Sequence, residues 1–296
     1  MKCLTNKIRV LFVVILTTLS LVATAQERIA LVIGNSNYEI SPLANTLNDA
    51  QDIAATLEGL DFSVTIVIDG DRKEMIKAIR AFGKSLDKKT IALFYYAGHG
   101  VQYNGENYLI PVGALPKITE RRYLNDEAVT LSTVTEEITL SGSKLNFVFL
   151  DACRNNPIPA DSRGIQTTGL IKKGAEGMII SYATAEGEVA EDGEKSEGGN
   201  SPYTKALLEL IVKPNVTIEV TLKSIRTAVR AATHNKQSPD YASSIEGEFC
   251  FKIEGEGCGI NIIIQNTIVD NPFLKGVDNI QLVELENGSK IGRAHV

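Results

Sequence analysis

The stretch from Leu145 to Asn156, which reads L-N-F-V-F-L-D-A-C-R-N-N, organises the rest of the chain. Its first half is largely apolar and contains Phe and Val, which is typical of a strand buried in a sheet. Where the apolar run ends, the chain presents Asp151, Cys153 and Arg154 in quick succession. The carboxyl ends of the strands are the usual ligand site of an open parallel sheet. Cys153 is therefore a candidate nucleophile at the tip of a predicted strand.

Apolar strands and amphipathic helices alternate along most of the chain. The predicted strands are 28–33, 62–68, 90–96, 145–150, 177–182 and 248–253, and helices are predicted to begin near Thr46, Asp71, Leu131, Ser201 and Thr217. Thr46 and Asp49 have the spacing of a capping box, and so do Asp71 and Glu74. The alternation indicates an α/β fold with a mostly parallel central sheet and helices on both faces.

The first 25 residues have the pattern of a secretory signal peptide. Basic residues precede an apolar run from Val10 to Val22, and Ala23-Thr24-Ala25 forms a small-x-small cleavage site. The run is short for a membrane span, so we expect cleavage after Ala25 and no stable membrane span in the mature protein. Export to the periplasm or to the extracellular medium follows. Retention of the segment as an anchor is the alternative.

The composition of the 296-residue chain is ordinary for a globular protein, with 44% hydrophobic and 22% charged residues. Removing the leader changes the formal charge from −6 to −9, because the leader carries three basic residues and no acidic one. An acidic protein is unsuited to nucleic acid and suited to basic ligands. In an oxidising compartment Cys250 and Cys258 could pair, which leaves Cys153 as an odd and therefore reactive thiol.

The character of the chain changes after Glu254. Residues 255–290 contain closely spaced glycines and β-like runs, and they form either a linker or the start of a truncated C-terminal region. We expect residues 291–296 to be the translation of a sequencing adapter rather than natural sequence. The catalytic chemistry is therefore expected in one domain between residues 26 and 254.

A nucleophilic cysteine needs a partner that favours its thiolate, since a free thiol with a pKa of about 8.5 is mostly protonated at neutral pH. His99 is the candidate, because it is one of three histidines and directly follows a predicted buried strand. Gly98 and Gly100 flank it and let the backbone turn tightly and a substrate approach. His99 and Cys153 are thus predicted to lie at the same end of two neighbouring parallel strands.

Two motifs resemble those of a known family. Y-Y-A-G-H-G at residues 95–100 and D-A-C-R-N at residues 151–155 together resemble the caspase-like cysteine peptidases, and most closely their bacterial metacaspase-like (orthocaspase) branch. Cys153 follows His99 by 54 positions, and the resemblance extends from residue 28 to about residue 253. It implies a caspase-like three-layer sandwich.

The resemblance also implies a mechanism. Cys153 would attack the scissile carbonyl, His99 would protonate the leaving amine, and the backbone N–H groups of Gly100 and Cys153 would form the oxyanion hole. No third member of a triad is evident, and a thiol needs one less than a hydroxyl does. No cofactor or metal is predicted, and loop acids such as Asp126 and Glu127 are too generic to indicate the calcium activation known in parts of the family.

Substrate preference is implied by one acidic position. In the metacaspase-like branch the acid two residues before the nucleophile lines the first specificity pocket and selects Arg or Lys, whereas caspases use arginines there to select Asp. This chain has Asp151 at that position and no arginine between residues 35 and 45. We therefore expect polypeptide substrates cleaved after basic residues, unless Asp151 only closes the strand end. Asp49 resembles a second acid near this pocket, and Tyr182 and Ala183 lie where the family's rim contacts the peptide backbone.

Three classes of function fit these motifs. The first is an exported cysteine endopeptidase with a Cys-His dyad, and the sequence favours it because both His99 and Cys153 are present. The second is a catalytically silent caspase-like module that binds or signals, which Asn155 in place of the family's usual Gly leaves open. The third is an amidase or transferase built on the same sheet. The sequence predicts no oligomeric state.

Overall fold

The fold is built on a sheet in which five neighbouring strands run parallel. In spatial order its strands are β2 (Phe62–Ile68), β1 (Arg28–Gly34), β3 (Ile91–Tyr103), β6 (Leu145–Cys153), β7 (Met178–Tyr182) and β8 (Asp240–Ser243). The edge strand β8 is antiparallel to β7, and all other neighbours in this order pair in parallel. Beyond the parallel region, β3 forms a hairpin with β4 (Glu106–Leu109), which also pairs with β5 (Val129–Thr130).

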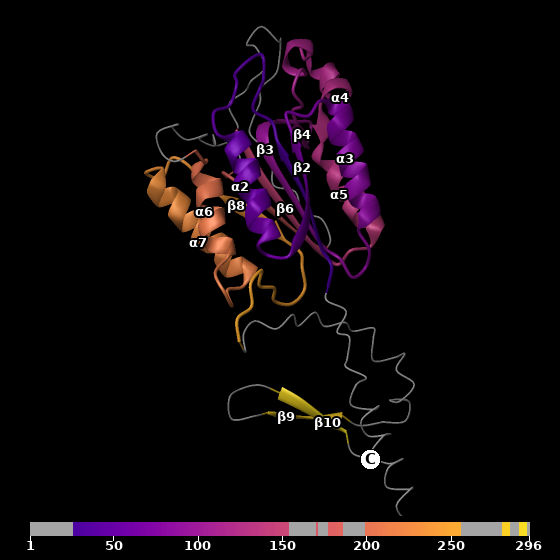
Figure 1. The fold of residues 1–296 in the computed structure, drawn as a ribbon, viewed down its shortest axis with the longest axis vertical. Coiled ribbons are helices and arrows are strands. Elements are labelled where there is room, and N and C mark those ends of the chain that lie inside the picture. The colour runs from indigo at the N-terminus through magenta and orange to yellow at the C-terminus, as the bar shows by residue number, and fades with distance from the viewer. Residues whose placement is uncertain are drawn as a thin grey trace, which may run out of the picture.

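Helices cover both faces of this sheet (Figure 1). One face carries α2 (Thr46–Glu58), α6 (Pro202–Ile211) and α7 (Ile218–Ala232), and the other carries α3 (Arg72–Ser85) and α5 (Leu131–Ser141). The short helices η1 (Leu115–Lys117), η2 (Arg121–Tyr123) and α4 (Leu124–Glu127) follow β4. The three layers confirm the predicted α/β sandwich with a mostly parallel central sheet.

The structure is a computed structural model that describes residues 26–153, 170, 177–185, 199–255, 280–284 and 290–294. For Arg121, Cys153 and the hairpin of β9 (Ile280–Glu284) and β10 (Lys290–Ala294), only the backbone is described. The predicted signal peptide, Arg154 and Cys258 lie outside the described residues. Within the described part, no helix is both long and apolar enough to cross a membrane.

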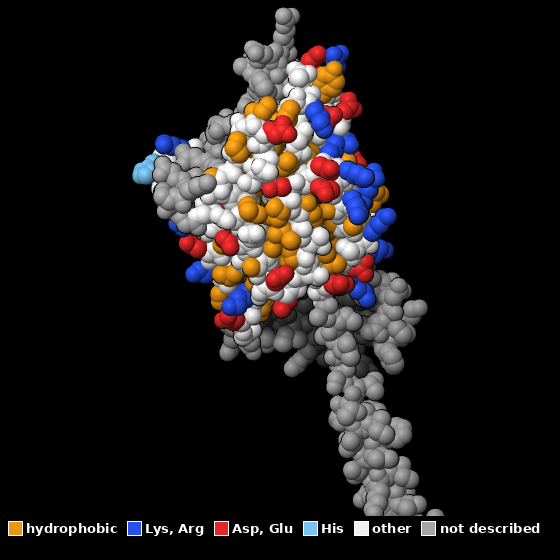
Figure 2. All heavy atoms as spheres, turned by 45° about the horizontal axis from the view of Figure 1, so that its top comes forward, with side chains coloured by type: hydrophobic (Ala, Val, Ile, Leu, Met, Phe, Trp, Pro, Cys, Tyr) orange, Lys and Arg blue, Asp and Glu red, His pale blue; other side chains and the backbone are white. Residues whose placement is uncertain are grey.

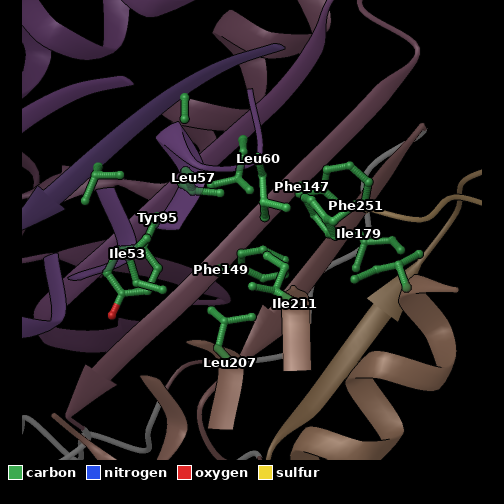
Figure 3. Packing of buried hydrophobic residues seen from close by; sticks show 14 of the residues in the cluster. Ile53, Leu57, Leu60, Tyr95, Phe147, Phe149, Ile179, Leu207, Ile211 and Phe251 are labelled. Atoms are coloured by element: carbon green, nitrogen blue, oxygen red, sulfur yellow. The ribbon is translucent and has the colours of Figure 1, made fainter. Parts of the chain in front are cut away.

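Strand β6 divides its side chains between the two faces of the sheet. Phe147 and Phe149 belong to the buried cluster under α2, α6 and α7, whereas Val148 and Leu150 belong to the cluster under α3 and α5. The Phe147 ring lies 4.9 Å from that of Phe251, and both lie among the buried side chains in Figure 3. Alternation with burial on both faces is what the apolar run of this strand predicts for a central parallel strand.

The segment from Glu248 to Ile253, predicted as a strand, is not one. The last strand of the sheet is β8, and the later segment has only an isolated bridge from Lys252 to Pro214. Its backbone carbonyls are used elsewhere, because Phe249 accepts from the Ile218 N–H at 2.8 Å and Phe251 accepts from the Arg28 guanidinium at 2.8 Å. The two Phe rings still enter the core, which explains the alternating apolar pattern without a sheet partner.

The predicted helix starts are partly correct. Asp71 forms the expected capping box with Glu74, and Ser201 caps α6 with Pro202 at its first turn. The capping box predicted for Thr46 and Asp49 is wrong, since α2 begins after Asn45 and has no side-chain cap. Asp49 is buried instead and accepts hydrogen bonds from the start of α6, distant in sequence, which no local pattern predicts.

Basic side chains gather on α3 although the chain as a whole is acidic. Lys73, Lys77, Arg80 and Lys84 are exposed and spaced so that they share one side of the helix. Figure 2 shows Lys and Arg side chains gathered along the side of the molecule on which Figure 1 places α3. Because α3 packs on the opposite sheet face from α2 and α6, this charge lies away from the face that those two helices cover.

Truncating the central aromatic side chain of β6 should destabilise the fold strongly. Phe147 is fully buried and its ring contacts those of Phe149, Phe249 and Phe251. We expect Phe147→Ala to lower the free energy of unfolding by about 3–5 kcal/mol, measured by urea denaturation. Leu140→Ala is the control, because Leu140 is 82% exposed, and it should change stability by less than about 0.5 kcal/mol. Equal effects of the two variants would contradict this account of the core.

Candidate active site

The pairing of β3 with β6 brings the two candidate catalytic residues together. The register runs from Ile91 opposite Leu145 to His99 opposite Cys153, the last pair of the ladder. Neighbouring strands lie about 4.8 Å apart, so the backbones of His99 and Cys153 are in direct contact range. The prediction that both residues lie at the same end of adjacent parallel strands is confirmed. Their catalytic roles stay a prediction.

The His99 ring is buried and held by one hydrogen bond. The residue is 2% exposed, and its Nε2 lies 2.7 Å from the backbone carbonyl oxygen of Ser41. Since a carbonyl oxygen only accepts, Nε2 must carry the proton of this bond. Nδ1 is also buried and has no hydrogen-bond partner among the described residues. In the neutral ring, Nδ1 is therefore the atom whose lone pair is available to take a proton.

Burial also sets the charge of this ring. Desolvation lowers the pKa of His99, and the hydrogen bond to the Ser41 carbonyl opposes part of that effect. A ring with a lowered pKa is neutral at pH 7. A neutral imidazole beside a thiol can accept the thiol proton and later return it to a leaving group. The lowered pKa of His99 is therefore compatible with the base role predicted for it.

Sequence reasoning missed Ser41, which orients His99 through its main chain. A backbone carbonyl has no side-chain signature, so no motif predicts it. Ser41 has a positive φ of 55° and directly precedes Pro42, where an extended backbone is the favoured conformation. The Ser-Pro pair predicts an extended backbone, so the positive φ of Ser41 was not predictable from it. The imidazole thus has an orienting partner even though no side chain among the described residues completes a triad.

Close packing explains the two glycines beside His99. A Cβ atom on Gly98 would lie 2.5 Å from the Tyr96 hydroxyl and 2.8 Å from the Tyr38 hydroxyl. A Cβ atom on Gly100 would lie 3.0 Å from the Cβ of Ala152. A side chain at Gly98 would therefore clash with the two hydroxyls, whereas one at Gly100 would require Ala152 to shift by a few tenths of an ångström. The role of the Gly100 and Cys153 N–H groups as an oxyanion hole stays a prediction.

Two buried carboxylates meet at the start of α6. Asp151 Oδ2 accepts hydrogen bonds from the Ser201 hydroxyl and, at 2.7 Å, from the Thr204 hydroxyl. Asp49 Oδ1 accepts from the Ser201 backbone N–H at 2.9 Å and from the Asn200 amide at 3.1 Å. The exposed N–H groups and the dipole of a helix N-terminus favour negative charge nearby. The structure therefore joins the two predicted specificity acids, from α2 and β6, through one helix start.

The pKa of Tyr95 is affected by both carboxylates. Its hydroxyl lies 2.6 Å from Thr204 Oγ1, and because that hydroxyl donates to Asp151, the Tyr95 hydroxyl is the donor here. The pKa of Tyr95 is raised well above its usual value, first by burial and then by the negative charges of Asp151 and Asp49. Both carboxylates thus act on the same buried point.

Tyr182 and Ala183 are not brought into this acid cluster. The Tyr182 side chain packs in the core under α3 and α5, on the opposite sheet face from the Asp151 contacts with α6. Ala183 donates its N–H to Leu150 O at 2.9 Å, and its carbonyl accepts from Gln237 at 2.8 Å. The main chain of Ala183 is therefore already engaged within the protein. Substrate contact by these two residues stays a prediction.

The loop acids considered for calcium are placed on α4. Asp126 is exposed, and Glu127 forms a surface ion pair with Lys117 at 3.5 Å. Within the described ranges, no group of three or more His, Cys, Asp or Glu side chains is arranged to hold a metal ion.

Comparison with known proteins finds a matching family model and two relatives of this chain. The family model described as "Caspase domain" matches residues 27–250. "Mucosa-associated lymphoid tissue lymphoma translocation protein 1" of Homo sapiens is 30% identical over 190 residues, which cover 64% of this chain and 22% of that protein. Its Mus musculus homolog is 26% identical over 247 residues, which cover 82% of this chain and 29% of the mouse protein. The chain spans less than a third of the length of either relative.

Burial of His99 should make stability depend on pH. The pKa of His99 is lowered in the folded state, so the unfolded chain binds the proton more readily. The free energy of unfolding therefore reaches its full value only above the pKa of the unfolded chain, about 6.5, and falls as the pH is lowered through it. Between about pH 7.5 and pH 5.5 the parent should lose up to about 1 kcal/mol more than His99→Gln, measured by urea denaturation at each pH.

His234→Asn is the matched control for this titration. His234 is exposed and has a φ of 51°, which Asn tolerates well. The control should retain the full pH dependence of the parent. If His99→Gln retained it as well, the pH dependence would not come from His99.

Proposed function

Because this chain belongs to the caspase-domain family, we propose that it is a cysteine endopeptidase that uses a dyad of Cys153 and His99. The observation that carries the proposal is the register of β3 and β6, which ends with His99 opposite Cys153. The neutral, buried imidazole with Nδ1 unbonded among the described residues supports its role as the base. Cys153 attacks the scissile carbonyl, and the imidazolium that forms protonates the leaving amine.

The proposed substrate is a polypeptide cleaved after arginine or lysine. Asp151 and Asp49 supply two negative charges at one buried point, and both are fixed by hydrogen bonds from the start of α6. A guanidinium binds a carboxylate with two charge-assisted hydrogen bonds, and an ammonium binds it as a point charge. An acidic substrate residue would instead meet like charges. The family branch that resembles this chain in its motifs has the same preference.

Export is part of the same proposal. The N-terminal segment has the pattern of a signal peptide, and Cys250 is disulfide-bonded, as an oxidising compartment permits. Its predicted partner, Cys258, lies outside the described residues. In such a compartment Cys153 would be the unpaired thiol of the mature chain, which fits a nucleophile.

Labelling with a thiol-reactive peptide analogue tests the dyad. A peptidyl reagent that ends in Arg and carries an electrophilic ketone should modify the parent at a single site. Cys153→Ala should abolish the labelling, and His99→Gln should slow it by about 100-fold or more, because the thiolate loses its base. A folded parent without specific labelling would contradict peptidase function and favour a silent binding module.

Cleavage of matched peptides tests the specificity acid. Parent kcat/KM should be highest with Arg before the cut, lower with Lys and negligible with Asp. Asp151→Asn should reduce kcat/KM for the Arg peptide by about 30- to 200-fold, which corresponds to about 2–3 kcal/mol for a hydrogen bond to a charged group.

Asp126→Asn serves as the control for loss of one negative charge, because Asp126 is exposed on α4. It should leave kcat/KM within about twofold of the parent, as expected for a surface substitution. A parent that prefers Asp before the cut would refute the assignment of Asp151. Equal losses in Asp151→Asn and Asp126→Asn would refute it too.

A further inference from the structure

The loop between β1 and α2 is tied down by hydrogen bonds of its own. Asp69 Oδ1 accepts from the backbone N–H groups of Ser36 at 2.7 Å and Asn37 at 2.9 Å. Ser36 then closes the loop on itself, because its hydroxyl donates to Leu43 O at 2.8 Å and its carbonyl accepts from the Leu43 N–H at 3.1 Å. These hydrogen bonds hold the loop, and Tyr38 within it, in place at the carboxyl end of the parallel strands.

Tyr38 touches His99 in two separate ways. The two rings lie 4.5 Å apart between centroids and are tilted by 47°. The Tyr38 hydroxyl accepts a hydrogen bond from the His99 backbone N–H at 3.1 Å and donates one to Ile110 O at 2.9 Å. Tyr38 is 3% exposed, so both contacts are made away from solvent. One side chain therefore restrains the imidazole and the main chain from which it projects.

The hydrogen bond to Ser41 alone leaves the imidazole one free motion. A single bond at Nε2 still permits the ring to swing by rotation about its Cβ–Cγ bond, and this swing would move Nδ1 out of any fixed position. The Tyr38 ring occupies one side of that swing. Its hydroxyl also packs over Gly98, whose missing Cβ leaves the space for it. Tyr38 and Ser41, from the same loop, thus restrain the ring at different atoms.

We propose that Tyr38 is a positioning residue for His99, which holds the imidazole so that Nδ1 keeps one direction toward the reacting groups. This inference rests on the dyad proposed above and deepens it. Tyr38 acts through His99 and exchanges no proton with the substrate. Its contribution is geometric, since displacement of a catalytic group by about 1 Å can cost on the order of 100-fold in rate.

Two variants separate the ring from the hydroxyl. Tyr38→Phe keeps the ring contact and loses the hydrogen bond to the His99 N–H, whereas Tyr38→Leu loses both. Tyr108→Phe is the matched control, because Tyr108 lies in the same buried cluster as Tyr38 and its hydroxyl bonds Asn125 at 2.8 Å rather than His99. Tyr38→Phe and Tyr108→Phe each remove one hydroxyl that donates a hydrogen bond inside the protein, so a loss of stability from that change alone would affect these two variants alike.

The readout compares an amide substrate with an ester that has the same acyl part. Acylation governs kcat/KM, and an activated ester leaves without the proton that a leaving amine needs from His99. For the amide, kcat/KM should fall by about 10- to 100-fold in Tyr38→Leu and by a smaller factor in Tyr38→Phe. For the ester it should fall by a smaller factor than for the amide in both variants, because attack still needs His99 as the base toward the thiol, whereas departure of the leaving group needs no proton. Tyr108→Phe should match the parent with both substrates.

Equal losses with amide and ester, or no loss with either, would overturn the positioning role while leaving the labelling of Cys153 intact.

A measurement that needs no turnover also tests the positioning role of Tyr38. In Cys153→Ala, the imidazole N–H of His99 should give a slowly exchanging proton resonance, and Tyr38→Leu in that background should abolish it. A resonance unchanged by the loss of Tyr38 would refute the proposal. Failure of the parent to label at Cys153 would instead refute the dyad itself.

Discussion

The parallel register between β3 and β6 sets the positions on which the site depends. Buried pairs such as Phe94 with Val148 and Tyr95 with Phe149 lie side by side along this ladder, and the pair of His99 with Cys153 ends it. A slip by one residue would turn every side chain of β6 to the opposite face. Phe147 would leave the aromatic cluster and Asp151 would lose α6. The packing that stabilises the core is therefore also what holds the candidate dyad in alignment.

The site solves a problem of buried charge. Asp49 and Asp151 are almost fully excluded from solvent, and unpaired charges in such a place would be costly. The start of α6 supplies the compensation, with the N–H and hydroxyl of Ser201 and the hydroxyl of Thr204. The proposed specificity for basic residues would therefore depend on the placement of this one helix. Because α6 and α3 cover opposite faces of the sheet, the acid pair also lies on the other face from the basic side chains of α3.

Local patterns predicted much of the fold because they are enforced locally. The capping box of Asp71 with Glu74 and the Ser201 cap of α6 were predicted correctly, since both depend on residues within one helical turn. The wrong predictions concern residues whose main contacts are with segments distant in the sequence. Asp49 serves α6 instead of its own helix start, and the segment around Phe251 is held by Arg28 rather than by a neighbouring strand.

The sequence by itself determined which chemical groups lie near the carboxyl end of the parallel ladder, because apolar runs mark the buried strands, although β3 continues past His99 and its two glycines to Tyr103. The sequence predicted the fold class and the position of His99 beside Cys153 on neighbouring strands. It also gave Asp151 as the candidate specificity acid. The tertiary structure decided what surrounds them. The Ser41 carbonyl and the Tyr38 ring reach His99 from a loop about 60 residues earlier, and Asp49 meets Asp151 only through α6. A backbone carbonyl and a contact between distant segments leave no periodic or motif signal, since only the folded chain brings them together.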